Sequence, residues 1–435
     1  MAVNRQGTSR GARAARSVGA DAVSSAADRT GGTSWRNIHV SRFTDAVRHG
    51  LHGSERGPLW VTLGLVALWL VFQGLDDSFL SPRNLSNLSV DIVGTGLVAI
   101  GVVFVLMIGE IDLSVGSVSG LAGAVFAVLS VNLGMTEWLA VILAVVTGTA
   151  VGAVHGTFFS RIGVPAFVIT LGGLLAWNGL TLLLLGASGA ININDEGLVA
   201  ALTSYYFSAI GAAYGLAALG TTGYLLASHQ LSKRRKAAGM PHRPLREIWV
   251  RTAVLALVAF AAAHVLNQFQ GLPLALLIFL VFLAGSDYVL HRTRYGRMIV
   301  AIGGGAESAR RAGIDVVRVR ISAFMLSSTL AAIGGLFVAS GLTAASPTTA
   351  RAAGSGMLLI NAIAAAVIGG TSLFGGRGST WSALLGVLVI QSIASGMALL
   401  GAQDAVQFLI TGGVLVAAVT VDTLSRRSHE ARGRP

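Results

Sequence analysis

The side chains best suited to chemistry in this sequence are polar residues that interrupt long apolar runs. Gly109-Glu110-Ile111-Asp112-Leu113-Ser114-Val115-Gly116-Ser117 places two carboxylates and two hydroxyls between two apolar segments. Backbone at such a break must be buried in protein or line a cavity, because hydrocarbon cannot satisfy its hydrogen bonds. Asp112 followed by Ser114 can also cap the next helix. The sequence leaves open whether this segment caps a helix or contacts a substrate.

A second segment, Ala301 to Asp315, combines glycine with charge. It contains Glu307-Ser308-Ala309-Arg310-Arg311-Ala312-Gly313. The pairing of Glu307 with Arg311, and the glycine that follows, predict a short helix from about Ala306 to Ala312. A helix of this length is not stable alone. Its partner surface is either the rest of the chain or another protein.

Enzymatic chemistry finds little support. Gly186-Ala187-Ser188-Gly189 matches the GxSG pattern of rhomboid-type intramembrane serine proteases, and His264 follows two apolar segments later. A Ser–His dyad needs hydrogen-bond reach and an oxyanion site, and GxSG is a weak pattern in a chain with 56 glycines. We assign no catalytic residue and keep the protease as the less favoured alternative.

Phosphate, thiol and metal chemistry are also disfavoured. The chain has no cysteine, and its only lysines, Lys233 and Lys236, do not follow a glycine as a Walker A lysine must. The chain is therefore not expected to hydrolyse ATP itself, and no metal site is assigned. An ion-coupled carrier remains an alternative, although carboxylates or histidines near the bilayer midplane are few.

The composition of the chain indicates whether most of it lies in water or in lipid. Of its 435 residues, 53% are hydrophobic and 11% are charged, whereas soluble domains are about 25% charged. The net charge of +12 lies in connecting segments and termini, which argues against nucleic-acid binding. Abundant glycine favours closely packed helices. These features predict a polytopic membrane protein.

Apolar runs near the ~20 residues that cross a bilayer predict an all-α bundle of about 12 transmembrane spans (10–12). We place them at 58–75, 90–108, 113–133, 138–159, 164–186, 205–228, 249–267, 272–290, 321–341, 356–371, 380–400 and 403–421. The membrane domain is thus 58–421, with inner loops 229–251 and 291–320. Residues 1–57 are expected to be a disordered basic cytoplasmic tail and 422–435 a cytoplasmic C-terminal tail. Residues 79–89, with Ser81-Pro82-Arg83-Asn84, are expected to be the start of a short interfacial helix.

The basic residues predict the orientation. With the N terminus inside, all Lys and Arg except Arg83 and Arg351 fall in cytoplasmic segments, as the positive-inside rule requires. Both termini are then cytoplasmic. Loop 229–251 contains Lys233-Arg234-Arg235-Lys236, which serves either as an orientation determinant or as a patch for lipid headgroups.

Four segments together resemble the monosaccharide permease family of ABC importers, in its ribose and xylose branch. They are Gly109–Ser117, Pro165–Gly173, the 301–315 loop and Val367–Ser379, which follow one another in family order across about 60–421. The resemblance implies a permease subunit of a bacterial inner-membrane sugar importer. This chain would bind no cofactor, because a separate ABC ATPase subunit uses the ATP. The other implied partners are an extracytoplasmic sugar-binding protein, a second permease copy and the lipid bilayer, with no nucleic acid.

The resemblance also implies roles for particular residues. The helix that docks into the ATPase would comprise Glu307, Ser308, Ala309, Arg310, Arg311 and Gly313. The chain departs from the family at Gly305, where members often carry Asn, and the position of Glu110 is variable in the family. The additional spans 205–228 and 249–267 look like the xylose-type permease, which implies D-xylose or a related pentose.

Two further sets of residues complete the expectation. The family's structural signature would comprise Asp112, Ser114, Gly116, Gly369, Gly370, Gly375 and Gly376. A neutral sugar needs uncharged polar groups along its path, and the candidates within spans are Thr170, Asn178, Asn361 and Gln391. Each of these four can instead form an interhelical hydrogen bond, worth about 0.6 kcal/mol in membrane bundles.

Overall fold

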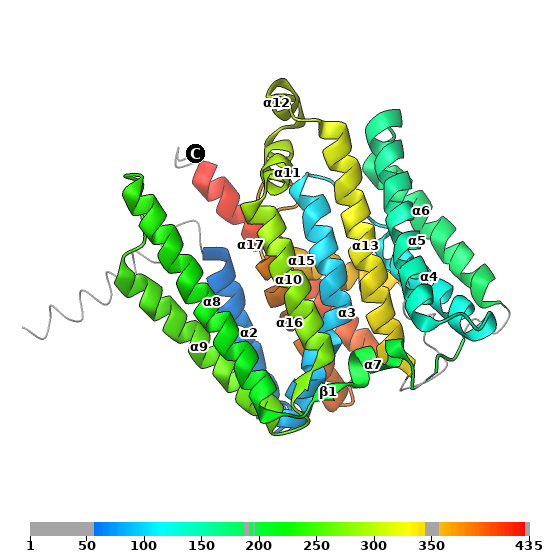
Figure 1. Ribbon diagram of the computed structural model, residues 1–435, viewed down its shortest axis with the longest axis horizontal. Helices are drawn as coiled ribbons and strands as arrows, with labels where there is room; N and C mark the ends of the chain where they lie inside the picture. Colours follow the sequence, from blue (N-terminus) through cyan, green and yellow to red (C-terminus); the bar gives the residue numbers. More distant parts are fainter. Residues whose placement is uncertain (1–55, 187–190, 195, 344–355, 431–435) are drawn as a thin grey trace, which may run out of the picture. The chain divides into compact units, whose positions relative to one another are not determined.

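A computed structural model describes residues 56–186, 191–194, 196–343 and 356–430. The described chain is almost entirely helical, and its only regular strands are β1 (Tyr206–Phe207) and β2 (Leu272–Pro273), which pair antiparallel. The polytopic all-α class predicted from composition is therefore confirmed (Figure 1).

The helices correspond one by one to the predicted spans, with three short helices between them. In chain order they are α2 (Arg56–Leu75), α3 (Pro82–Met107), α4 (Val115–Ala127), α5 (Glu137–Thr157), α6 (Ala166–Leu185), α7 (Leu198–Ser204), α8 (Ile210–Ala237), α9 (Leu245–Asn267), α10 (Leu274–Arg292), α11 (Arg294–Gly304), α12 (Ala306–Arg311), α13 (Val316–Thr343), α15 (Gly356–Ile368), α16 (Thr380–Leu399) and α17 (Asp404–Glu430). Single π-helical turns, Val128–Asn132 and Phe158–Ile162, extend α4 and α5.

Within the described ranges, nine helices are long and apolar enough to cross a membrane. Three shorter apolar helices, Trp60–Leu75, Met357–Ile368 and Ala405–Ala417, fall at the remaining predicted spans. The number of membrane crossings thus stays a prediction. The predicted tail 1–57 lies almost wholly outside the described residues, whereas α17 continues through much of the predicted tail 422–435.

Several predicted connections are helical instead. The predicted helix start within residues 79–89 is present, since Ser81 caps α3 by accepting a hydrogen bond from the Asn84 amide and Pro82 begins that helix. The helix is continuous with the span, however, and is not a separate interfacial helix. This arrangement suits Pro, whose missing N–H costs nothing in a first turn. Loop 229–251 is reduced to residues 238–244 between α8 and α9, and α11 and α12 occupy much of loop 291–320.

Helix α13 is packed through glycines. Gly148, Gly152 and Gly156 recur every four residues on α5, and each meets the α13 backbone closely: a Cβ at Gly152 would lie 2.7 Å from Cα of Met325. On α3, a Cβ at Gly101 would lie 2.8 Å from the carbonyl oxygen of Ser327. Such small-residue faces let membrane helices approach closely enough to gain dispersion energy.

Helices α8 and α9 form a hairpin inserted between α7 and α10. The strands β1 and β2 join its base, with Tyr206 opposite Pro273 and Phe207 opposite Leu272. Gly271 precedes β2 with φ 95°, and a side chain there would collide with the carbonyl of Phe207. Glycine is required at this position because the conformation is left-handed and the neighbouring backbone is in contact.

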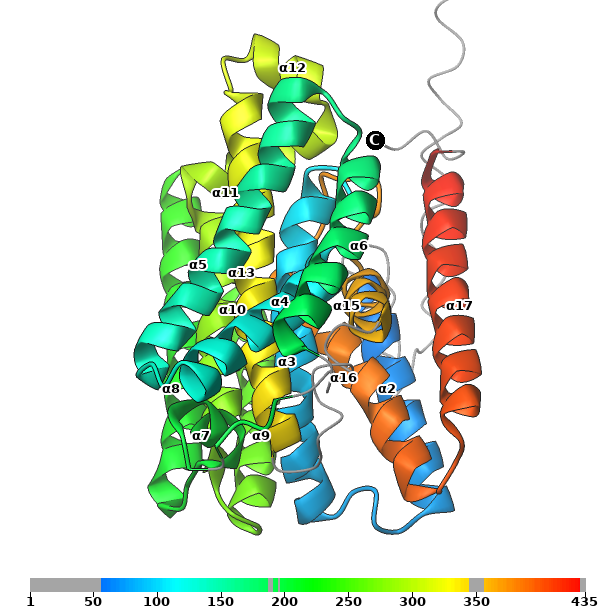
Figure 2. The same cartoon turned by 90° about the vertical axis from the view of Figure 1, so that its right-hand side faces the viewer.

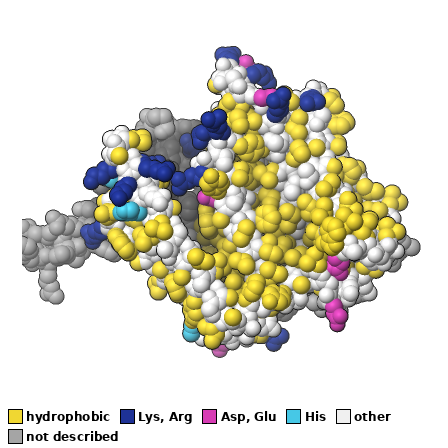
Figure 3. Space-filling model, in the orientation of Figure 1, with side chains coloured by type: hydrophobic (Ala, Val, Ile, Leu, Met, Phe, Trp, Pro, Cys, Tyr) yellow, Lys and Arg dark blue, Asp and Glu magenta, His cyan; other side chains and the backbone are white. Residues whose placement is uncertain are grey.

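The two ends of the helices differ in charge. One end, which we call the basic end, carries α12 and the junction of α8 with α9 (Figures 1 and 2). Lys and Arg gather there in Figure 3, with few acidic side chains among them. The opposite end, which we call the acidic end, shows acidic side chains and few basic ones. Asp76 and Asp77 follow α2, and Glu137 begins α5, at the acidic end. This separation agrees with the asymmetry predicted from the sequence.

Replacing Gly152 by Val should destabilise the bundle by about 1–3 kcal/mol, because overpacking forces the backbone of α13 away from α5. We expect a lower thermal midpoint and less monodisperse protein in detergent. Gly172→Val on α6 is the control, since a Cβ there meets nothing within 4 Å. Equal loss in both variants would mean that valine's helix propensity, and not the α5–α13 contact, sets the cost.

Candidate functional site

Three glycine-containing segments meet at the basic end. The amide of Gly376 donates a hydrogen bond of 2.9 Å to the carbonyl of Met107, the last residue of α3. A Cβ at Gly303 would overlap Met107 and Gly376, and a Cβ at Gly375 would lie 2.9 Å from the amide of Gly109. We call this contact of residues 107–109, 303–304 and 375–376 the glycine junction. It unites three segments that the sequence analysis singled out separately.

Helix α12 projects from this junction. The predicted short helix is confirmed at Ala306–Arg311, and Gly313 follows with φ 83°. Ala309 is 3% exposed and anchors the helix to the protein. Glu307 is exposed and pairs with Arg310 at 3.0 Å and with Arg311 at 3.4 Å. Of the six residues that the resemblance assigned to docking, Ala309 thus faces the protein, whereas Glu307, Ser308 and the arginines remain on the surface.

Helix α11 ties α12 to the bundle. Its first turn is capped by Thr293, whose hydroxyl accepts from the Gly296 amide at 3.2 Å. The hydroxyls of Tyr295 and Ser322 lie 2.9 Å apart and join α11 to α13. The amide of Ile314 bonds to the carbonyl of Ala309 just before α13 begins. A displacement of α12 is therefore passed to both α11 and α13.

A buried hydrogen-bond chain lies beside the junction. Ser114 donates to Asp112 Oδ1 through its amide, at 2.9 Å, and through its hydroxyl, at 2.5 Å. Trp177 Nε1 donates to His155 Nε2 at 3.0 Å. The proton of the neutral imidazole is then on Nδ1, which lies 3.1 Å from the Ser114 hydroxyl and donates to it. The chain thus connects the α3–α4 segment with α5 and α6.

The same hydrogen-bonded side chains contact the fourth segment that the sequence analysis identified, Pro165–Gly173. A Cβ at Gly173 on α6 would lie 2.7 Å from His155 Cε1 and 3.1 Å from Trp177 Nε1. Glycine therefore leaves the space in which these two rings meet. Gly116 is also in close contact, since its Cβ would lie 3.1 Å from that of Leu359 on α15. Both glycines serve packing.

The order of the side chains along these hydrogen bonds is not that of a hydrolase. In a nucleophilic triad the imidazole stands between hydroxyl and carboxylate, whereas here Ser114 stands between His155 and Asp112. Asp112 and Ser114 are 2% and 0% exposed. Burial raises the pKa of Asp112, and the hydrogen bonds from Ser114 oppose this. The arrangement positions backbone before α4, which supports the structural alternative for Asp112.

Glu110 makes a different contact. Its carboxylate lies 3.6 Å from Arg320 on α13, and the Arg320 guanidinium lies 4.6 Å from the ring centre of Phe159 at the end of α5. Burial raises the pKa of Glu110, and the Arg320 charge opposes this. The pair links the α3–α4 segment to α13 and α5.

The four candidate path residues differ in their surroundings. The Thr170 hydroxyl is buried and donates to the Ala166 carbonyl of its own helix at 2.9 Å. Asn178, Asn361 and Gln391 are half-buried on α6, α15 and α16. Helix α15 packs on α16 and α4, and α6 packs on α4, so α4 separates the two groups of helices.

The described residues give no support to the Ser188–His264 protease or to a metal site. Ser188 lies outside the described residues. His264 is exposed, and its ring nitrogens lie 3.2 Å from the Tyr214 hydroxyl and 3.0 Å from the Gln268 amide. In the described ranges, no three His, Cys, Asp or Glu side chains are grouped to hold a metal.

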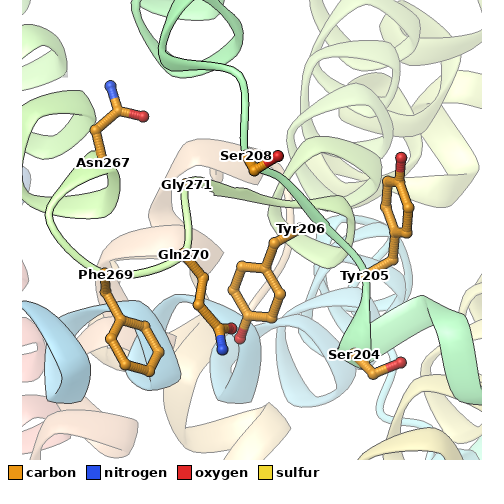
Figure 4. Close-up of a pocket in the computed structure, with 8 residues that line it drawn as sticks. All are labelled: Ser204, Tyr205, Tyr206, Ser208, Asn267, Phe269, Gln270 and Gly271. Carbon is orange, nitrogen blue, oxygen red and sulfur yellow. The ribbon is translucent and has the colours of Figure 1, made fainter.

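An open cavity of about 510 Å³ lies at the acidic end, beside the base of the α8–α9 hairpin (Figures 1 and 4). Its lining is uncharged: Ser204, Tyr205, Tyr206, Ser208, Asn267, Phe269, Gln270 and Gly271. Figure 4 shows Tyr206 and Gln270 side by side, with Tyr205 pointing elsewhere. The sequence analysis missed this cavity because its residues come from two loops about 60 positions apart.

Asp112→Ala should lower thermal stability by about 1–3 kcal/mol, because the buried amide and hydroxyl of Ser114 lose their acceptor. Asp112→Asn should cost less, since an amide oxygen can still accept both hydrogen bonds. Because the folded-state pKa is raised, the wild type should lose stability as pH rises from the unfolded pKa through the folded pKa, and Asp112→Asn should not. Melting curves across the acid pH range check this, and a wild-type-like Asp112→Ala would contradict it.

Comparisons with known proteins place the chain in a family. Residues 84–419 match a family described as the branched-chain amino acid transport system / permease component. The xylose transport system permease protein of Escherichia coli K12 is 34% identical over 364 residues, which cover 83% of this chain and 91% of that protein. Its Haemophilus influenzae counterpart is 32% identical, covering 85% and 97%.

The ribose import permease protein of Bacillus subtilis is 32% identical over 360 residues, covering 83% of this chain and 91% of that protein. No solved structure matches the chain. The family match spans all four segments, from the glycine junction to the His155 chain. The chain therefore belongs to the family described as the branched-chain amino acid transport system / permease component, in the branch that contains the xylose and ribose permeases.

Proposed function

We propose that this chain is the membrane permease subunit of an ATP-driven ABC importer for a monosaccharide, D-xylose or a related pentose. The observation that carries the proposal is that three of the four family-like segments meet at the glycine junction beside α12, and that the fourth, 165–173, is joined to them through His155, in a chain whose relatives are xylose and ribose permeases. The chain is a transport component and works with an ATPase subunit and an extracytoplasmic sugar-binding protein. The xylose permeases are supported over the ribose permeases by their higher identity in Escherichia coli, 34% against 29%.

In this proposal the basic end is cytoplasmic and α12 is the contact with the ATPase. The exposed side chains of Glu307, Arg310 and Arg311 would enter a groove of that subunit. ATP binding there would shift α12, and the ties through Tyr295 and Ile314 would carry the shift into α13. The bundle then changes between outward-open and inward-open states by a small rearrangement of packed helices.

Two copies of the chain would form the sugar path between them. Membrane-spanning helices such as α6 expose large aliphatic side chains, with Leu183 79% exposed. A second copy could pack against this apolar surface. Asn178, Asn361 and Gln391 are the proposed path residues. The amides of these side chains can match sugar hydroxyls without introducing charge. The sugar-binding protein would dock at the acidic end.

An ion-coupled secondary carrier is the competing function. Both carboxylates of the 109–117 segment already serve the protein itself: Glu110 with Arg320 and Asp112 with Ser114. A carrier would also take up sugar as a purified chain in vesicles under a proton or sodium gradient. The importer subunit would be inert in that assay until its ATPase is added.

Reversing Glu307 to Arg should abolish xylose uptake while leaving membrane insertion and yield unchanged, because the α12 surface changes charge without losing its Ala309 anchor. The co-purifying ATPase should be lost with it. Glu247→Arg is the matched control, since Glu247 is a half-buried carboxylate that also pairs with two arginines at the basic end. Wild-type uptake by the Glu307 variant, or failure of the wild type to retain any ATPase, would sink the proposal.

Asn361→Leu should reduce the rate of labelled xylose uptake by roughly tenfold, the scale of one lost hydrogen bond to a sugar hydroxyl, with unchanged folded yield. Thr170→Val should instead leave uptake near normal, because its hydroxyl bonds only within α6. Uptake is to be compared for xylose and ribose. Unaltered uptake of both sugars in Asn361→Leu would remove this residue from the path.

A further inference from the structure

The α8–α9 hairpin ends in a concentrated group of cations, which we call the basic tip (residues 233–246). The Ser232 hydroxyl donates to the Arg243 carbonyl at 2.8 Å and fixes the turn between the two helices. The nearest acid, Glu247, pairs with Arg243 at 3.6 Å and Arg251 at 3.0 Å. The remaining cations form no ion pair with any described residue: Lys233, Arg234, Arg235, Lys236 and Arg246.

The rest of the bundle does not use this charge. Helix α8 packs mainly on α9 and β1, and α9 contacts α3 and β2, near the base of the hairpin. At the basic end, the hairpin stands apart from α10 and α11 (Figure 1). Exposed cations occupy this tip in Figure 3. The charges therefore face surroundings other than this bundle.

Helix dipoles account for only part of the tip. Lys233 to Lys236 lie in the last turns of α8, where the helix C-terminus favours cations. Arg246 lies in the first turn of α9, where the same effect disfavours a cation. Arg246 is exposed and forms no ion pair with a described residue, so its guanidinium is free to bind an anion.

Along the axis of α9, the exposed side chains change in the same order as the layers of a lipid leaflet. About 4.5 Å along the axis from Arg246 comes Trp249, which is 61% exposed. Exposed aliphatic side chains follow deeper along the helix, among them Val254 at 58% and Leu257 at 73%. Cation, indole and aliphatic side chain thus succeed one another as phosphate, interface and hydrocarbon do in a leaflet.

We propose that the basic tip binds the phosphate groups of anionic phospholipids, with the acyl chains against the exposed aliphatic face of α9. Orientation during insertion requires positive charge only on the correct side. It does not require cations from two helices held by a fixed turn, nor one placed against a helix dipole. The proposal does not depend on which sugar is transported, and only its assignment to the cytoplasmic leaflet rests on the proposed function.

Lysine chemistry provides a direct test, because Lys233 and Lys236 are the only lysines in the chain. The full chain is placed in nanodiscs of phosphatidylcholine, with or without phosphatidylglycerol, and treated with an amine-acetylating reagent. Mass spectrometry then gives the acetylation rate at both lysines, with the N-terminal amine as internal reference. We expect phosphatidylglycerol to slow acetylation of the lysines severalfold relative to that reference.

Two outcomes of this experiment would overturn the proposal. One is equal acetylation in neutral and anionic discs. The other is equal protection by inorganic phosphate added to neutral discs, which would assign the site to a free anion and not to a lipid.

A charge-matched pair of variants separates the basic tip from general electrostatics. Lys233→Gln/Lys236→Gln/Arg246→Gln should reduce the phosphatidylglycerol that co-purifies with the chain by roughly half. The control Arg292→Gln/Arg294→Gln/Arg297→Gln, which removes three exposed cations from the same end of the bundle, should retain it. Both are compared as monodisperse protein. Equal loss from both variants would show that total charge, and not the basic tip, attracts the lipid.

Discussion

Close contact between backbones around α13 is the constraint on which the rest of this structure depends. In a bilayer, apolar helix surfaces gain little by leaving lipid, so association relies on dispersion at short range and on interhelical hydrogen bonds. The glycines of α3 and α5 permit that approach, and the hydroxyls of Thr149 and Thr329, 2.7 Å apart, add a polar contact. Backbone packed on backbone cannot slide gradually. Helix α13 must therefore move together with α3 and α5, or exchange one packed arrangement for another.

Because α13 is packed rigidly, a displacement of α12 would move other helices with it. A six-residue helix stores little energy, but its neighbours α11 and α13 and the glycine junction are all fixed by short contacts. The junction leaves no room for side chains at Gly303 or Gly375, so the α3 end and the 375–376 turn cannot yield independently. A force on α12 would therefore displace α11, α13 and the end of α3 together.

The sequence predicted the parts of this arrangement that depend on local pattern. Apolar run length located the helices, and the Glu307–Arg311 spacing with Gly313 located α12. The polar segment 79–89 was predicted as the start of a short interfacial helix; a helix does begin there, at Pro82, but it continues without interruption into the span. The Asn84 side chain is satisfied there by tertiary contact, accepting from Ser395 at 2.9 Å. The spacing of Gly148, Gly152 and Gly156 could have identified the α5 face. The Ser114–His155–Trp177 chain could not have been found, because it joins three helices whose relative position no local pattern encodes.

The buried polar groups also bear on where the transport energy enters. A carboxylate that binds a coupling ion must exchange its partner during each cycle, whereas Asp112 is buried and its Oδ1 accepts two hydrogen bonds from Ser114, whose hydroxyl is in turn held by His155. Breaking that chain would expose unsatisfied groups in a medium that cannot solvate them. Glu110, which is held to α13 by Arg320, fixes the same segment from its other side. The polar residues near the glycine junction thus act to keep one conformation rigid. In the proposed function, the energy that changes this conformation enters through the ATPase subunit, which contacts the exposed charges of α12.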